Sequence, residues 1–124
     1  GRPTGLQGWY MNPTLIAGVT NEAEICRHEL FGPVGVLLPY DSLEEAIEIA
    51  NDSEFGLAAA IFGPVDQAKK VSEKLRVGSV YINGGGSIRM DAPMGGVKKS
   101  GIGREYGEAG IAEFLEDQHV QWSI

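Results

Sequence analysis

The stretch Glu29-Leu30-Phe31-Gly32-Pro33-Val34 places a carboxylate, an aromatic ring and a Gly-Pro bend directly before an apolar run. An ionised carboxylate only accepts hydrogen bonds, so Glu29 suits two vicinal hydroxyls such as those of a ribose. Phe31 is able to lie against a flat ring. In an extended segment residues i and i+2 share one side, which predicts that both side chains face one ligand. The competing interpretation places Phe31 in the core and Glu29 in solvent.

Strand-like and helix-like stretches alternate on both sides of this motif, which favours an α/β fold with a layered parallel sheet. Strands are predicted over residues 10–16, 34–40, 56–62, 80–83 and 119–124. Helices are predicted over residues 22–28, 66–76 and 108–116, and from Ser42 onward. The stretch that begins at Ser42 has the form of a capping box, with Ser42 as the N-cap and Glu45 at the third helical position.

Glycine accumulates after Asn83, in a stretch that continues to about Gly103. A connection of this length is uncommon inside a compact domain, so we expect it to be functional or to line a site. Residues 101–107 resemble a dinucleotide-binding fingerprint, but three residues instead of two precede the last glycine, and a loop precedes them instead of a strand. This spacing disfavours a phosphate-binding role.

The sequence contains one cysteine and two histidines. Cys26 and His28 lie two positions apart, and such positions point to different sides of a helix, so His28 is not placed to take a proton from Cys26. Cys26 is interpreted as a partly buried small residue, and no catalytic residue is assigned. So few cysteines and histidines do not complete a zinc site of the usual ligand count, so no metal is predicted.

Composition places the chain among ordinary globular proteins, with 124 residues, 43% hydrophobic residues and a net charge of −7. Nucleic acids and anionic membranes need basic patches, so neither is an expected partner. No apolar run approaches the roughly 18 residues of a membrane span. No secretory signal is recognisable and a single cysteine suits a reducing compartment, so a cytoplasmic location is expected.

The motifs together resemble the C-terminal portion of the NAD(P)-dependent aldehyde dehydrogenases. The resemblance covers the chain from about Gly8 to Ile124, and its motifs follow one another in the order that the family shows. They lie at residues 13–15, 29–34, 44–46, 50–51, 56–59, 78–83 and 93–107.

The resemblance implies that residues 1–107 belong to the catalytic domain and that residues 108–124 form a terminal helix and an oligomerisation strand. Glu29 matches the family's glutamate that hydrogen-bonds the nicotinamide ribose, and Phe31 matches the aromatic residue beside the nicotinamide. The loop from Gly84 to Met94 matches the segment that borders the aldehyde tunnel. Met94 stands where phenylalanine is common, which permits a flexible apolar wall.

In the family a cysteine attacks the aldehyde to give a thiohemiacetal, hydride passes to the nicotinamide of NAD or NADP, and the thioester is hydrolysed. The cysteine and the general base lie upstream of the matched segment. The chain is therefore expected to be inactive alone, and to act with the remainder of a dehydrogenase chain, a small-molecule aldehyde and other subunits of a homo-oligomer.

Two alternatives remain open at this point. One is a non-catalytic interaction module that keeps the subunit-pairing surface of the family. The other is a free-standing nucleotide-binding α/β domain, which the glycine spacing of residues 101–107 disfavours.

Overall fold

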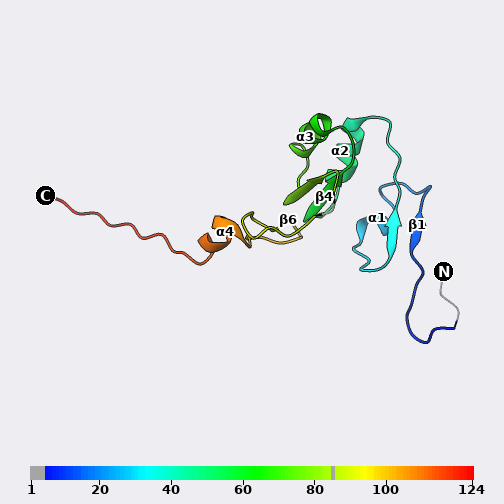
Figure 1. The fold of residues 1–124 in the computed structure, drawn as a ribbon, viewed down its shortest axis with the longest axis horizontal. Coiled ribbons are helices and arrows are strands. Elements are labelled where there is room, and N and C mark those ends of the chain that lie inside the picture. Colours follow the sequence, from blue (N-terminus) through cyan, green and yellow to red (C-terminus); the bar gives the residue numbers. More distant parts are fainter. Residues whose placement is uncertain (1–4, 85) are drawn as a thin grey trace. The chain divides into compact units, whose positions relative to one another are not determined.

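The computed structural model describes residues 5–84 and 86–124. The chain forms two compact units, Gly1–Ser53 and Glu54–Ile124, each with its own helices and strands (Figure 1). The boundary predicted from the sequence, between residues 107 and 108, separates a catalytic part from an oligomerisation part. It concerns the complete protein and stays a prediction.

The described residues of the first unit form two strands and two helices in alternation. In chain order they are β1 (Thr14–Ile16), α1 (Glu24–Arg27), β2 (Val34–Val36) and α2 (Leu43–Asn51). β1 and β2 pair in parallel, with Thr14 opposite Val34 and Ile16 opposite Val36. A parallel pair needs a crossover connection, and α1 lies within it. The predicted strands at 10–16 and 34–40 and the predicted helix at 22–28 are confirmed, each in a shorter form.

Helix α2 begins where the sequence predicts. The Ser42 hydroxyl accepts a hydrogen bond from the Glu45 amide at 3.1 Å, as an N-cap side chain should. The Glu45 carboxylate accepts from the Asp41 amide at 2.7 Å, one residue before the amide that a standard capping box uses. Ile47 faces inward and is 9% exposed. The polar cap and the apolar face together fix this helix.

In the second unit, the part of the chain that the structure describes forms four strands and two helices. In chain order they are β3 (Phe55–Gly56), β4 (Ala58–Ile61), α3 (Val65–Ser72), β5 (Ser79–Ile82), β6 (Val97–Lys98) and α4 (Gly107–Ala112). β4 and β5 pair in parallel, from Ala58 opposite Ser79 to Ile61 opposite Ile82, and α3 lies in the crossover between them. The predicted strands at 56–62 and 80–83 are confirmed, and the helix predicted over 66–76 ends at Ser72.

The glycine-rich stretch contains more regular pairing than we expect from its composition. β6 pairs antiparallel with β3, with Phe55 opposite Lys98 and Gly56 opposite Val97. The Ser100 hydroxyl, two residues after β6, accepts a hydrogen bond from the Gly56 amide of β3 at 2.9 Å, which also holds the two segments together. Strands of two residues are too short to show the alternation on which sequence-based assignment depends, so the sequence contains no indication of β6.

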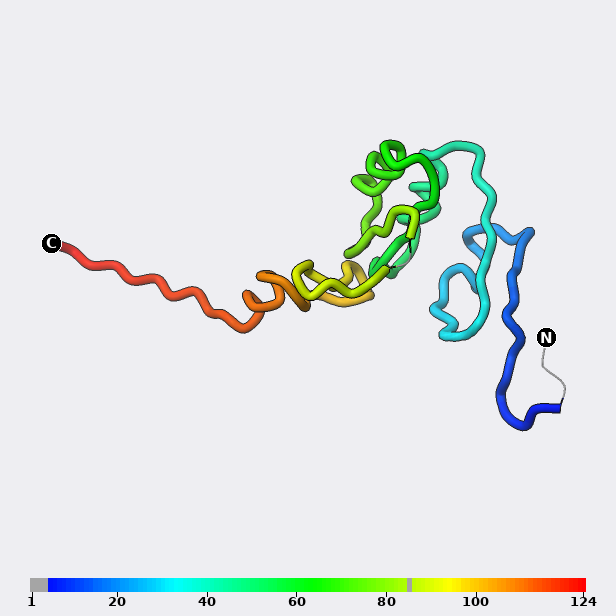
Figure 2. The backbone as a smooth tube through the Cα atoms, viewed as in Figure 1, coloured from blue at the N-terminus to red at the C-terminus, as the bar shows by residue number. Residues whose placement is uncertain are grey.

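The chain after α4 contains no helix or strand in residues 115–124. Figure 2 shows this segment, in red, as extended backbone beyond α4. α4 is shorter than the predicted helix at 108–116, and the strand expected at 119–124 is absent from the described chain. A strand requires a neighbouring strand for its backbone hydrogen bonds, and the expectation placed that neighbour in another subunit. That pairing stays a prediction.

Few apolar side chains of the described residues are buried: Ile47 at 9% exposure and Ala68 at 2%. Large apolar side chains are exposed in both units, among them Trp9, Leu15, Phe31, Ile102, Phe114 and Trp122. So many large apolar groups on a surface are typical of regions that pack against other protein. No helix in the described part of the chain is long and apolar enough to cross a membrane.

Candidate functional site

A pocket of about 280 Å³ lies at the turn between α1 and β2. Its lining comes from the end of α1, the turn itself and β2, and it includes Glu29, Phe31 and Val36. The structure therefore brings the two residues selected from the sequence to one concave surface. The chain fold explains this, because the crossover between two parallel strands must reverse direction here before β2 begins.

The backbone at Phe31 differs from the extended conformation that the sequence analysis assumed. Its φ is 48°, in the left-handed region, which costs a side-chain-bearing residue about 1–2 kcal/mol. The Val34 amide donates to the Gly32 carbonyl at 2.8 Å, closing a tight turn around Pro33. The phenyl ring is 93% exposed as a result. Phe31 and Glu29 share a pocket because of this turn, not because of strand alternation.

The Glu29 carboxylate is available to a ligand. The side chain is exposed, and none of the residues that the structure describes forms a hydrogen bond or ion pair with it. The neighbouring His28 points back to its own helix, with its Nε2 3.7 Å from Glu24 Oε1. Both oxygens of Glu29 are thus free to accept hydrogen bonds from hydroxyl groups.

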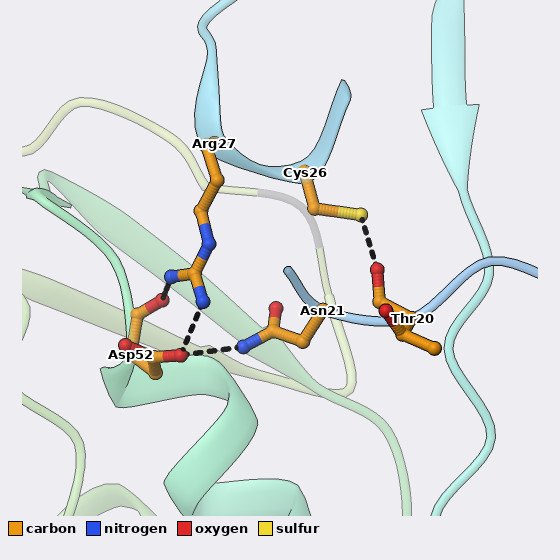
Figure 3. A network of polar contacts seen from close by, with 5 residues as sticks. All are labelled: Thr20, Asn21, Cys26, Arg27 and Asp52. Atoms are coloured by element: carbon orange, nitrogen blue, oxygen red, sulfur yellow. Dashed lines mark hydrogen bonds and ion pairs between the residues drawn. The ribbon is translucent and has the colours of Figure 1, made fainter. Parts of the chain in front are cut away.

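A polar network fixes α1 (Figure 3). The residues directly after α1 line the pocket. Arg27 donates from Nη2 to Asp52 Oδ2 and from Nη1 to the Asp52 carbonyl, each at 2.7 Å. Asn21 Nδ2 donates to the same carboxylate oxygen at 2.7 Å. The hydrogen bond that Arg27 donates to the Asp52 side chain raises the pKa of the Arg27 guanidinium, which keeps it charged. The sequence gives no signal for this network, because its partners lie 25 and 31 residues apart.

The thiol of Cys26 forms a hydrogen bond with the protein backbone. Its Sγ donates to the Thr20 carbonyl at 3.5 Å (Figure 3). The Nε2 atom of His28 lies instead 3.7 Å from Glu24 Oε1. The sequence-based interpretation of Cys26 agrees with this geometry. Within residues 5–84 and 86–124, no group of three or more histidine, cysteine, aspartate or glutamate side chains is placed to hold a metal ion.

In the second unit, Met94 lies between two pockets. One of about 210 Å³ is formed with β5 and the loop before Met94, and one of about 660 Å³ is formed with the glycine-rich segment and α4. The Met94 amide donates to the Glu105 carbonyl at 2.7 Å, and the Glu105 amide returns the bond at 2.7 Å. This reciprocal pair holds the half-buried Met94 at the boundary of both pockets.

The loop from residue 84 to Met94 is fixed at both ends. Before it, the Asn83 side-chain amide donates to the Gly63 carbonyl and accepts from the Gly63 amide, both at 2.8 Å. These two residues follow the carboxyl ends of β5 and β4, the edge at which open parallel sheets usually bind ligands. Near its other end, the Gly107 amide donates to the Met90 carbonyl at 3.0 Å.

Residues 101–106 of the segment 101–107 form one wall of the larger pocket. The guanidinium of Arg104, within this segment, binds the protein backbone. Its Nη1 donates to the carbonyls of Gly96 at 2.8 Å and Gly103 at 2.6 Å. Sequence reasoning did not foresee this role, although an arginine within a glycine-rich segment is a usual partner for exposed carbonyls. This arrangement gives no support to a phosphate-binding role for residues 101–107, which their glycine spacing already disfavours.

A comparison with protein families matches residues 1–120 to the aldehyde dehydrogenase family. The chain belongs to the aldehyde dehydrogenase family. This confirms the resemblance that the motifs between residues 13 and 107 indicated.

Individual dehydrogenases are similar over nearly the whole chain. The 3-succinoylsemialdehyde-pyridine dehydrogenase of Pseudomonas sp. is 45% identical over 122 residues, which are 97% of this chain and 25% of that protein. The aldehyde dehydrogenase of Mycobacterium tuberculosis complexed with NAD⁺ matches with a TM-score of 0.86 and 44% identity, over 92% of this chain and 24% of that one. A mutant of aldehyde dehydrogenase C of Pseudomonas syringae, with NAD⁺ and octanal, also gives a TM-score of 0.86 and 44% identity, over 94% and 24%.

The chain thus spans about a quarter of the length of these dehydrogenases. Their likeness confirms the α/β class with parallel strands that the sequence predicts. The roles of Glu29, Phe31 and Met94 are not decided by likeness alone and stay predictions.

Proposed function

We propose that this chain supplies the C-terminal portion of an NAD(P)-dependent aldehyde dehydrogenase, an oxidoreductase that converts an aldehyde to a carboxylic acid. The observation that carries the proposal is the pocket at the α1–β2 turn, where an exposed phenyl ring occurs together with a carboxylate that has no partner among the described residues. The similar dehydrogenases from Mycobacterium tuberculosis and Pseudomonas syringae bind NAD⁺, which supports NAD or NADP as the ligand.

The chemistry of the pocket fits the nicotinamide half of such a cofactor. Glu29 offers two oxygens to the two vicinal hydroxyls of a ribose, and hydrogen bonds to an ionised acceptor are among the stronger ones. Phe31 offers an exposed ring face to a flat heterocycle. Bound there, the cofactor supplies the hydride acceptor. The left-handed backbone at Phe31 is typical of positions where a protein stores strain to orient a ligand.

Met94 and its loop form the second part of the proposal, as a border of the aldehyde tunnel. The methionine is flexible and apolar, so it suits the tail of an aldehyde better than a charged group. Octanal, which the Pseudomonas syringae dehydrogenase binds, is an aldehyde of that kind.

The complete enzyme requires more than this chain. A nucleophilic cysteine forms the thiohemiacetal. We place that cysteine in the remainder of the dehydrogenase chain, because the Cys26 thiol donates a hydrogen bond to the Thr20 carbonyl. The isolated chain is then inactive. Residues 119–124 form the strand that joins subunits of a homo-oligomer, and the enzyme acts in the cytoplasm.

The first test is an amide proton–nitrogen NMR titration of the chain with NAD⁺. Shifts confined to residues near Glu29 and Phe31 are expected, and Glu29→Gln should weaken them. Glu48→Gln is the matched control, because Glu48 is also exposed but lies on α2 away from the pocket. No response at any NAD⁺ concentration, or the same response in Glu29→Gln, would remove the proposed cofactor role of this pocket.

The second test uses the complete dehydrogenase. Glu29→Gln should slow hydride transfer and raise the KM for NAD(P) while leaving the KM for the aldehyde nearly unchanged. Unchanged kinetics with NAD(P) would mean that Glu29 does not hold the cofactor.

A further inference from the structure

The loop between β5 and Met94 carries an ion pair that the proposed function does not use. Arg89 Nε donates to Asp91 Oδ1 at 2.9 Å, and Arg89 Nη2 donates to Asp91 Oδ2 at 2.6 Å. Both side chains are 69% exposed. The contact is bidentate, so one carboxylate occupies one whole edge of the guanidinium.

Arg89 also lines the pocket of about 210 Å³ that Met94 borders. The other lining residues are apolar or carry hydroxyl groups: Ser79, Val80, Tyr81, Ser87, Ile88, Ala92, Pro93 and Met94. Among the described residues of this lining, Arg89 alone is charged. Its charge therefore decides whether the pocket attracts an anion.

Asp91, two residues after Arg89 in the same loop, neutralises the charge of the Arg89 guanidinium. A ligand carboxylate must displace Asp91 to gain the Nε–Nη2 edge that Asp91 occupies, and Asp91 competes from within the molecule at a high effective concentration. Once displaced, Asp91 would stand beside the ligand as a like charge. The hydrogen bonds from Arg89 lower the pKa of the Asp91 carboxyl, so Asp91 remains ionised at neutral pH.

We propose that Asp91 sets the charge preference of this pocket, so that the pocket takes uncharged, largely apolar aldehydes and disfavours aldehydes that carry a carboxylate. The inference rests on the proposed function insofar as it treats the pocket as part of the aldehyde tunnel. Asp91 contacts Arg89, not the reacting atoms, and is a specificity-determining residue.

Binding to the chain itself gives the first test. Butanoate is the anionic probe and butanamide the uncharged one, and the readout is the NMR signal of the Arg89 Nε–Hε group. In Asp91→Asn the pocket keeps Arg89 without its partner charge, and butanoate should bind roughly fivefold more tightly than to the unsubstituted chain. Asp117→Asn is the matched control, with the same change of net charge outside the pocket.

Each outcome of the binding test decides the inference. Equal butanoate binding by the unsubstituted chain and Asp91→Asn would overturn it, as would an equal gain in Asp117→Asn. A failure of butanoate to shift the Arg89 signal in Asp91→Asn would also overturn it. The double variant Arg89→Gln with Asp91→Asn should lose the response, and a retained response would place the anion elsewhere.

Kinetics of the complete dehydrogenase give the second test, with butanal and 4-oxobutanoate as substrates of equal chain length. Asp91→Asn should move the ratio of their kcat/KM values roughly fivefold toward 4-oxobutanoate. An unchanged ratio with active enzyme would overturn the role of Asp91. An unsubstituted enzyme that oxidises neither aldehyde would overturn the proposed function instead, and the butanoate titration would still decide the role of Asp91.

Discussion

Arg27 Nη2 lies 2.7 Å from Asp52 Oδ2, which joins α1, the helix before the pocket at the α1–β2 turn, to the residue that ends α2. α1 has only one turn and no buried residue, so packing alone does not hold it. The guanidinium instead reaches the carboxylate and the carbonyl of Asp52 together. The position of Glu29, two residues after Arg27, therefore depends on a contact outside the pocket.

Arg27→Met should disturb the pocket without touching its lining. The substitution keeps an apolar stem but removes both hydrogen bonds to Asp52, so α1 loses its anchor. We expect a lower midpoint of thermal unfolding and amide shift changes concentrated at residues 28–32. Lys70→Met, an exposed substitution on α3, is the control and should leave those amides unchanged. If both variants give the same spectrum around Glu29, the anchor is not needed.

Ser42→Ala should lower the free energy of unfolding by about 1 kcal/mol, because it removes the acceptor of the Glu45 amide at the start of α2. Ser42→Asp keeps an acceptor at the N-cap and should retain most of the stability. Urea unfolding followed by circular dichroism measures both changes. Equal losses in the two variants would show that the hydroxyl does not cap the helix.

Gly78→Ala should lower the free energy of unfolding of the second unit by at least about 1–3 kcal/mol. The reason is that an added methyl group would overlap the Gly95 carbonyl oxygen. The backbone of Gly78 also donates to the carbonyls of Gly56 and Leu57 at 3.1 Å, so it is not free to move away. Gly84→Ala is the matched control, since its nearest contact is an ordinary 3.9 Å. Equal unfolding midpoints for the two alanine variants would contradict this packing.

Local patterns in the sequence predicted much of the fold correctly. Ser42 and Glu45 mark the beginning of α2 because capping chemistry depends on residues only three positions apart. The paired strands β4 and β5 were predicted from short apolar runs on either side of an amphipathic helix, which is the signature of a parallel crossover. Glu29 and Phe31 both line one pocket, but Phe31 lacks the extended backbone from which the sequence predicted a shared side, and their roles stay predictions.

Other features were hidden because they arise from distant contacts or from unusual backbone. The left-handed φ of Phe31 has no sequence signal, since a bulky residue ordinarily avoids that region. The bond between Arg27 and Asp52 joins a half-buried arginine to an exposed aspartate, and neither residue stands out in the sequence. β3 and β6 are two residues each, too short for a period to appear.

The carboxyl of Asp91 should titrate below the ordinary range of an aspartate, because hydrogen bonds from Arg89 lower its pKa. The folded pKa is then lower than the unfolded one, so the pair contributes stability above the unfolded value. That contribution disappears as the pH falls through the folded value. Both side chains are exposed, so the effect on stability is small, and carbon NMR of the carboxyl is the measurement. Arg89→Gln should return the midpoint to the ordinary range; an unchanged midpoint would exclude Arg89 as the cause.

The chain should self-associate through its C-terminal segment. Val120, Trp122 and Ile124 alternate, so they share one face if the segment is extended, and all are exposed. A second copy that pairs with this segment would satisfy its backbone groups and cover that face. Trp122→Glu places a charge on the face and should shift the chain toward monomer in sedimentation velocity measured across a range of concentrations. Gln121→Glu places the same charge on the opposite face and should shift it less. A chain that is monomeric at every concentration, or equal shifts in both variants, would show that this face does not drive association.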